Sequence, residues 1–193
     1  MSIEKIITVP HAGLRQVAEP IVDITPELEL ELQNLADTLL AQDDPPGVGL
    51  AFPQVNHLWR AFATNLETSQ SETPIKRFFL NPKIIDHGDK LTLGPNPNSP
   101  DLEGCLSIPW LYAPIWRPEW VTMEWQEIEN GELSELKRET FYDFPARVMQ
   151  HELDHLNGVL FTDYVISQGQ PLYRSEGKKL VETDSVIIEA WSK

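Results

Sequence analysis

The sequence has a single cysteine and no long apolar run, and each shortage excludes a class of protein. Its one cysteine, Cys105, cannot form an intramolecular disulfide, which excludes a disulfide-stabilised secreted scaffold. The chain contains no run of about 18 apolar residues and no apolar signal segment, so neither a membrane span nor a secretory leader is predicted. We therefore expect a cytoplasmic protein that does not enter membranes.

Basic residues are also scarce, with 15 Lys and Arg against 30 Asp and Glu, and the formal net charge at pH 7 is −15. A surface of this charge repels nucleic acid and anionic lipid, so we expect no direct nucleic-acid partner and no membrane partner. The hydrophobic content of 41% and the charged content of 23% are ordinary for a globular protein. Residues 1–193 carry no internal repeat and are predicted to form a single domain with a substantial core.

Capping residues and the spacing of apolar residues indicate the regular structure. Thr25 and Pro26 are typical of a helix start, and a leucine stripe with helical spacing follows at Leu28, Leu32, Leu35 and Leu39. Strand-like runs occupy residues 59–64, 76–80, 121–126 and 133–142. Asn130-Gly131, between the last two runs, is a strong hairpin signal. These elements predict the α+β class, with antiparallel sheets around a C-terminal helix.

That C-terminal helix is expected to contain the stretch QHELDHLNGVLF, residues 150–161. Asp143 is expected to cap its start, and Pro145 fits its first turn, where a missing N–H costs nothing. Asn157-Gly158 is expected to end it, because both residues tolerate the left-handed conformation. These signals predict that the whole HExxH pattern lies on one helix.

The two histidines of this pattern are candidate metal ligands. Because a helix repeats about every 3.6 residues, His151 and His155 lie on one face and their imidazoles can share an ion. Glu152 then stands beside the ion, close enough to transfer a proton. The site needs a third ligand, for which Cys105 is the natural candidate. The alternatives are a hydrogen-bonded core histidine and a small, buried, apolar cysteine.

Two further stretches are unusual: GVGLAFPQ, residues 47–54, and EGCLSIP, residues 103–109. Neither is decisive alone, since glycines often mark turns and a Gly-Cys pair is often plain packing. Together with HELDH, and in this order along the chain, they resemble the signature stretches of peptide deformylases. The resemblance extends to ARVMQHELDHLNGVLF around the helix and covers most of residues 9–165.

The resemblance implies a metal-dependent hydrolase that removes the formyl group from N-formylmethionyl nascent peptides and releases formate. Cys105, His151 and His155 would be the protein ligands of one divalent metal. In the family this metal is typically Fe²⁺ in cells, while Zn²⁺, Ni²⁺ or Co²⁺ often appears in purified protein. A thiolate with two imidazoles suits these ions and excludes a site for calcium or magnesium.

The resemblance also assigns the groups around the metal. Glu152 would transfer protons, and the side chain of Gln54 and the backbone N–H of Leu106 would stabilise the oxyanion. Asp154 is turned off the histidine face by its spacing, and Arg117 is its expected ion-pair partner.

The substrate is expected to lie extended against backbone that glycines leave open, with its methionine in an apolar pocket. Simple core packing would explain the pocket residues equally well. The expected substrate-binding residues are Val48, Gly49, Gly104, Phe144, Arg147 and Val148.

The sequence departs from the family pattern near these stretches. Phe52 stands where the family usually has alanine, Tyr112 where arginine is common, and Trp110 where a smaller or polar residue is usual. Trp110, Tyr112 and Trp116 are interpreted as a local packing cluster, with an aromatic lip on the substrate groove as the alternative.

The C-terminal tail bears on possible partners. Some deformylases dock on the ribosome through a basic terminal helix. Here the positive charge of Lys178 and Lys179 is offset by four nearby acids, Glu176, Glu182, Asp184 and Glu189. This argues against a transient ribosome contact of this kind.

Three other functions remain open from the sequence. A zincin-like protease also uses HExxH, but it usually draws its third ligand from downstream, where this chain has no histidine. A catalytically altered relative would act on a different formyl peptide or acyl amide. A non-enzymatic descendant would bind metal or formylated peptides without turnover.

Overall fold

The structure is a computed structural model, and it describes residues 2–44, 46–68, 71–96, 98–177 and 179–191. α1 (Pro26–Leu40) begins as predicted, because Thr25 Oγ1 accepts a hydrogen bond from Leu28 N at 3.2 Å. The leucine stripe of α1 is buried against β1 and β2 in one hydrophobic cluster. Two short 3-10 helices are also present: η1 (Ala12–Arg15) precedes α1 in the chain, and η2 (Phe52–Val55) follows β1.

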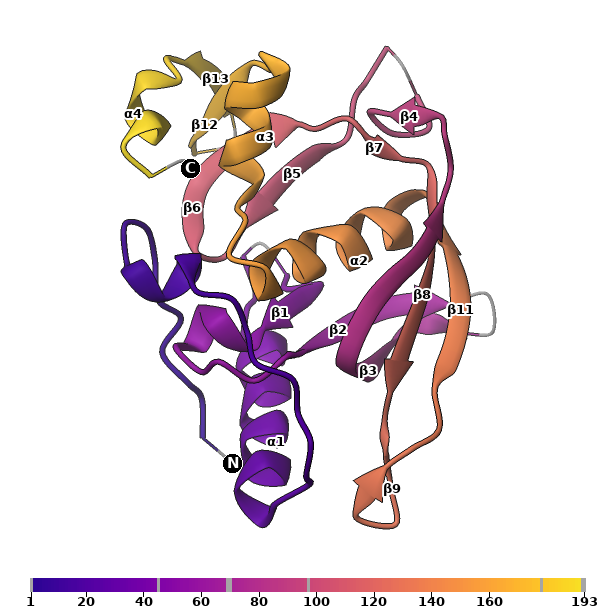
Figure 1. Ribbon diagram of the computed structural model, residues 1–193. Helices are drawn as coiled ribbons and strands as arrows, with labels where there is room; N and C mark the ends of the chain where they lie inside the picture. The colour runs from indigo at the N-terminus through magenta and orange to yellow at the C-terminus, as the bar shows by residue number, and fades with distance from the viewer. Residues whose placement is uncertain (1, 45, 69–70, 97, 178, 192–193) are drawn as a thin grey trace.

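Two antiparallel sheets hold most of the strands (Figure 1). The five-stranded sheet has the order β1 (Gly49–Ala51), β2 (Ala61–Thr68), β3 (Ser71–His87), β8 (Trp120–Gln126) and β11 (Lys137–Tyr142). The four-stranded sheet has the order β13 (Lys179–Thr183), β12 (Leu172–Glu176), β6 (Ile108–Pro114) and β5 (Leu102–Cys105). Two ribbons pair β9 (Ile128–Glu129) with β10 (Glu132–Leu133), and β4 (Leu91–Thr92) with β7 (Arg117–Pro118).

The predicted strands are present with different bounds. The run 76–80 is only part of β3, which is 17 residues long in total. The run 133–142 divides into β10 and β11. Asn130 and Gly131 have φ of 54° and 80°, the left-handed conformation that a tight hairpin turn requires. The strands of the four-stranded sheet were not predicted, because their apolar residues do not alternate regularly.

α2 (Asp143–Leu156) carries the HExxH pattern as predicted, but its start differs. The N-cap residue is Tyr142, and Asp143 itself has φ of 51° and donates its N–H to Glu119 O at 3.0 Å. The prediction that Asp143 caps the helix is therefore wrong, because the chain makes a left-handed turn there as it leaves β11. The predicted end is confirmed by Gly158, whose φ is 67°.

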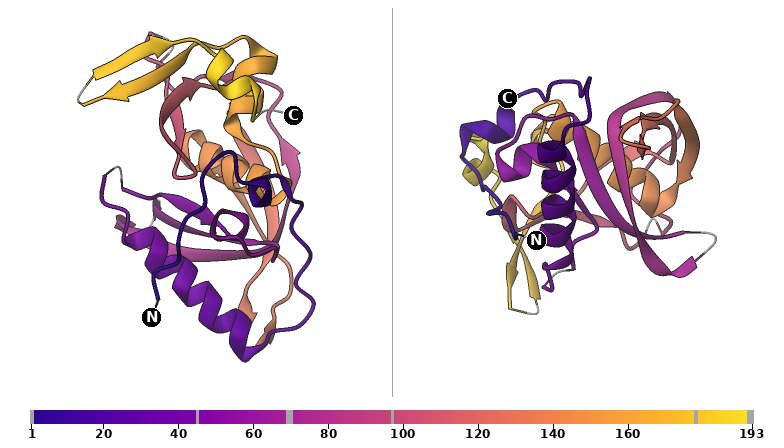
Figure 2. Two further views of the ribbon diagram at one scale, coloured as in Figure 1. Left: turned by 90° about the vertical axis from the view of Figure 1, so that its left-hand side faces the viewer. Right: turned by 90° about the horizontal axis from the view of Figure 1, so that it is seen from below.

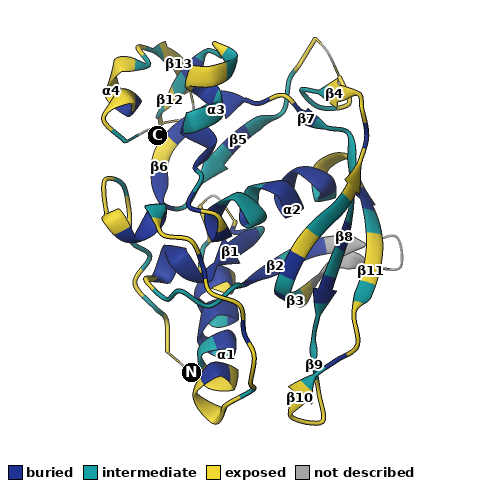
Figure 3. Cartoon of the chain, in the orientation of Figure 1, coloured by how far each residue is buried: buried dark blue, intermediate teal, exposed yellow. Residues whose placement is uncertain are grey.

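α2 lies at the centre of the molecule, between β5 and the five-stranded sheet (Figures 1 and 3). Its buried apolar residues pack on β2, β3, β8 and β11 in one cluster: Ala146, Val148, Met149 and Leu156. α3 (Phe161–Gln168) and α4 (Val186–Glu189) pack with β6 and β12 in another. The β12–β13 hairpin projects from this end of the molecule (Figure 2). Among the described residues, no helix is long and apolar enough to cross a membrane.

Candidate metal centre and active site

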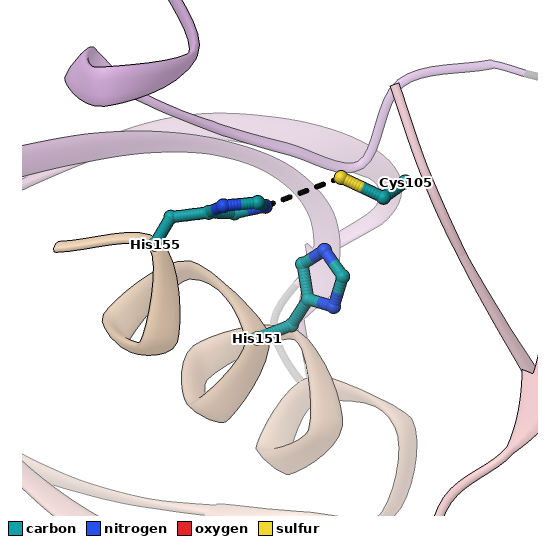
Figure 4. A group of neighbouring side chains, drawn as sticks. All are labelled: Cys105, His151 and His155. Atoms are coloured by element: carbon teal, nitrogen blue, oxygen red, sulfur yellow. Dashed lines mark hydrogen bonds between the residues drawn. The ribbon is translucent and has the colours of Figure 1, made fainter. Parts of the chain in front are cut away.

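Cys105, His151 and His155 converge between β5 and α2 (Figure 4). The ring centroids of the two histidines lie 4.9 Å apart at an interplanar angle of 81°. Cys105 is the last residue of β5, and its Sγ lies 3.2 Å from His155 Nε2. One ligand atom from each of the three residues lies within 4.8 Å of the others. The fold thus assembles the three residues that the sequence singled out.

The donor atoms of this cluster fit a divalent transition metal. A thiol sulfur with two imidazole nitrogens suits iron, zinc, cobalt or nickel. His151 Nδ1 lies 3.3 Å from Glu103 Oε2, which leaves the other ring nitrogen for an ion. Three protein ligands leave a coordination position for water or substrate, the pattern of a catalytic metal site.

A buried charge network lies behind His151. Glu103 accepts hydrogen bonds from Arg117 Nε at 2.6 Å and from Arg117 Nη2 at 2.9 Å. Arg117 Nη1 donates to Asp154 Oδ2 at 2.8 Å, so the predicted Arg117–Asp154 pair is confirmed. Burial opposes ionisation of Glu103, but the charge of Arg117 and the hydrogen bond with His151 lower its pKa below the ordinary value. Glu103 is therefore held as a carboxylate that can orient the His151 ring.

Arg147 belongs to the same network. Its Nη1 donates to Ile115 O at 2.8 Å and to Glu103 Oε1 at 3.2 Å. Its Nη2 donates to Thr92 O at 2.5 Å. The guanidinium therefore ties β4 and β5 to α2, and protein groups occupy its donors.

Glu152 is buried beside Gly49 of β1, with 3% of its surface exposed. A methyl group added at Gly49 would lie 2.7 Å from the carboxyl carbon of Glu152, so glycine is needed there to leave room. Burial raises the pKa of Glu152 to about 7. Its Oε2 has no hydrogen-bond partner among the described residues. A carboxyl group that titrates near neutrality and has a free oxygen is suited to proton transfer.

The side chain of Gln54 in η2 is fixed at both ends of its amide. Oε1 accepts a hydrogen bond from Ala51 N at 2.8 Å. Nε2 donates to Ser107 Oγ at 3.2 Å and lies 3.6 Å from Cys105 Sγ. The donor end of the amide therefore faces the cluster of candidate ligands.

The residues that depart from the family pattern have separate surroundings. Phe52 is fully buried and packs edge-to-face on Trp59, with centroids 5.2 Å apart, so the cluster around α1 accommodates its bulk. The Tyr112 ring lies over Gly104, where an added methyl group would come within 2.6 Å of it. Trp110 is 62% exposed and Trp116 is 41% exposed, so the interpretation of a packed aromatic cluster is wrong for these two residues.

A cavity of about 380 Å³ opens beside the cluster. Its lining includes Gln54, Cys105, Leu106, His151 and Glu152. It also includes each residue that the sequence predicted to bind substrate: Val48, Gly49, Gly104, Phe144, Arg147 and Val148. The three sequence stretches thus form one concave site.

Comparison with known proteins identifies the family. The sequence model described as polypeptide deformylase matches residues 3–170. The chain belongs to this family. The peptide deformylase of Afipia carboxidovorans is 36% identical over 165 residues, which cover 86% of this chain and 88% of that protein. The peptide deformylase of Mesorhizobium japonicum is 34% identical over 183 residues, which cover 94% and 95%. A crystal structure of a peptide deformylase from Legionella pneumophila has a TM-score of 0.68 and 30% identity, covering 84% of this chain and 86% of that one.

Membership of the deformylase family confirms the enzyme class that the motifs predicted, a metal-dependent amidohydrolase. It also confirms the α+β class with antiparallel sheets and a metal site on a late helix. The third donor comes from Cys105, upstream of the helix, which disfavours the zincin-like alternative.

Sequence reasoning gave no role to several residues that support the deformylase site. Glu103 and Ser107 flank Cys105 within the EGCLS stretch, where their position was the available signal. Tyr164 donates from its hydroxyl to Asp154 Oδ1 at 3.2 Å, and its ring lies under the Arg117 guanidinium at 4.8 Å. Nothing in the local sequence marks Tyr164, because Arg117, which its ring contacts, is distant in the chain.

Proposed function

We propose that this chain hydrolyses the formyl amide of N-formylmethionyl peptides from newly made proteins, releasing formate and a free amino terminus. The single observation that carries the proposal is the convergence of Cys105, His151 and His155 beside a buried Glu152 in a cavity lined by the deformylase motifs.

One divalent ion would be held by Cys105 Sγ and the imidazoles of His151 and His155. When bound, it would supply Lewis-acid activation of water and of the formyl carbonyl. The donor set suits Fe²⁺, Zn²⁺, Ni²⁺ and Co²⁺, and Fe²⁺ is the ion proposed for the cell.

Glu152 would move the protons of the reaction. An amide nitrogen is a poor leaving group unless it is protonated, so the site must take a proton from the attacking water and deliver one to nitrogen. A pKa of about 7 lets the same carboxyl group perform both transfers near neutral pH. Gly49 supports this role because it leaves space for the carboxyl group.

The oxyanion would be stabilised by Gln54 Nε2 and the backbone N–H of Leu106. The hydrogen bonds of Gln54 to Ala51 and Ser107 support this role, because they orient the amide before substrate arrives. Donors fixed in this way need no reorganisation during the reaction.

The substrate would bind in extended form, with its backbone against Val48, Gly49 and Gly104. Its methionine side chain would occupy the apolar part of the cavity beside Phe144, Val148 and the aliphatic stem of Arg147. Val148 is buried and Phe144 is 48% exposed, so the pocket would run from the core to the surface.

Anaerobically prepared iron protein should release formate from formyl-Met-Ala-Ser, and Glu152→Gln should abolish most of this release. Cleavage of an internal peptide bond instead would identify a protease. Release of another acid from an acyl-Met peptide, with formate absent, would identify an altered acyl-amide hydrolase. Peptide binding without release of any acid would identify a non-enzymatic relative.

Three wider features are part of the proposal. Residues 1–193 would act as one catalytic domain in the cytoplasm, with newly made chains as the partner. The packing of α3, α4 and β12 on β6 in a shared cluster supports one domain. The acidic residues of the tail do not favour a ribosome contact through it. Of the two lysines in the tail, Lys178 lies outside the described residues and Lys179 is exposed in β13.

A further inference from the structure

Trp110 has a backbone conformation that is costly for a bulky residue. Its φ is 71°, in the left-handed region. The other non-glycine residues with positive φ in the described part of the chain are asparagines and one aspartate, which tolerate this region. Trp110 is also 62% exposed, so burial of its ring in the core does not offset the strain. Strain of this kind, retained without a packing reason, points to a functional role.

A bulge in the four-stranded sheet sets the position of Trp110. Cys105 of β5 pairs with Ile108 of β6, whereas Gly104 pairs with Tyr112. One step along β5 is therefore matched by four steps along β6, and residues 109–111 have no partner in β5. Trp110 is the middle residue of this bulge, and Ile108, two positions before it, pairs with the candidate metal ligand Cys105. Both Pro109 and Trp110 are exposed, which breaks the alternation expected of a regular strand.

The bulge directs Trp110 to the catalytic cavity. Trp110 is among the residues that line the cavity, together with Gln54, Glu152 and Phe144. The formyl group must reach the metal ligands and the methionine must enter the apolar pocket, so the rest of the peptide has to leave towards solvent. An exposed aromatic ring that still lines the cavity therefore stands where the following residues pass.

We propose that Trp110 is a specificity-determining residue, whose ring contacts the second or third residue of the formylated peptide and favours an aromatic side chain there. The inference rests on the proposed function and adds a substrate preference to it. Aromatic pairs attract each other beyond the area that they bury, and an exposed ring at a cavity mouth offers such a contact to an incoming peptide.

Four variants of the iron enzyme test the proposal with formyl-Met-Ala-Ser, formyl-Met-Phe-Ser and formyl-Met-Ala-Phe. The wild type should favour one of the two phenylalanine peptides over formyl-Met-Ala-Ser by about three- to tenfold in kcat/KM. Trp110→Gly and Trp110→Ala should lose this preference mainly through a higher KM, and Trp110→Phe should retain most of it. Trp116→Ala is the matched control, because Trp116 is also exposed but is not among the residues that line the cavity. The substrate preference of this variant should equal that of the wild type.

Thermal unfolding separates this role from a structural one. Glycine adopts positive φ freely and alanine does not, so Trp110→Gly should melt roughly 2–4 °C above Trp110→Ala. The proposal is overturned if Trp110→Gly retains the wild-type preference, or if the wild type shows no preference for either phenylalanine peptide. Absence of formate release from all three peptides by the wild type would instead overturn the proposed function.

Discussion

At the scale of single residues, the site depends on side chains that have little room. Glu152 lies against Gly49, and Gln54 is held between Ala51 and Ser107. The sequence predicted Glu152 and Gln54 as functional residues, from the HExxH pattern and the family resemblance respectively. It could not predict the contact between Glu152 and Gly49, because that contact joins segments that are distant in the chain.

We expect Gly49→Ala to reduce kcat by roughly 10²-fold while the fold and the metal content are retained. The added methyl group would overlap the Glu152 carboxyl group and displace it from its working position, and a shift of about 1 Å can cost that much. Steady-state kinetics and metal analysis of the purified variant measure both quantities. Wild-type kcat in Gly49→Ala would show that the carboxyl group does not need this space.

We expect Gln54→Ala to lower kcat by roughly 10²–10³-fold, because one oxyanion donor is lost. Cys105, His151 and His155 are unchanged, so metal content should stay near one ion per chain. Formate release at saturating substrate measures the effect. Unchanged turnover would remove Gln54 from the mechanism.

At the scale of elements, the Glu103 network joins β5, β7 and α2. Glu103 of β5 binds Arg117 of β7, and it also contacts His151 and Arg147 of α2. The helical period could be read from the sequence, and it predicted which residues share a face of α2. The strands that this face of α2 contacts could not be predicted, because contacts between a helix and distant strands depend on long-range packing.

Glu103→Gln should destabilise the protein by about 3–5 kcal/mol, because it leaves the buried Arg117 charge poorly compensated. Glu119→Gln is the matched control. Its partner Lys90 has 73% of its side chain exposed, and an exposed pair of this kind contributes little to stability. Urea denaturation of both variants measures the difference. Equal losses of stability in the two variants would show that the network is not a major source of stability.

At the scale of the whole molecule, the protein is strongly acidic, and acidic residues contribute to the lining of the cavity. The formal net charge is −15, and Asp44 and Asp101 are among the residues that line the cavity. Arg147 is the only lysine or arginine in that lining within the described part of the chain, and its guanidinium is bonded to protein groups. The net charge was evident from composition, but the acids that line the cavity could be identified only from the fold.

The charge predicts a preference among substrates that depends on ionic strength. Formyl-Met-Ala-Lys should have a kcat/KM several-fold above that of formyl-Met-Ala-Glu at about 10 mM salt, because the acidic protein and the acids of the cavity lining attract the positive side chain. At about 0.5 M salt the ratio should fall towards one, since screening shortens the range of the interaction. Competition between the two peptides at each salt concentration measures the ratio directly. A ratio that does not change with salt would contradict an electrostatic origin.

The sequence by itself determined the chemistry of the late helix. Backbone geometry alone puts His151 and His155 on one face and Glu152 beside them, because the helical period is a local property. Tertiary structure decided that Cys105, 50 positions from His155, meets them. It also decided that Glu103 supports the site and that Trp110, in a bulge of β6, lines the cavity. These features depend on strand register and packing between distant segments, which no local pattern of residues specifies.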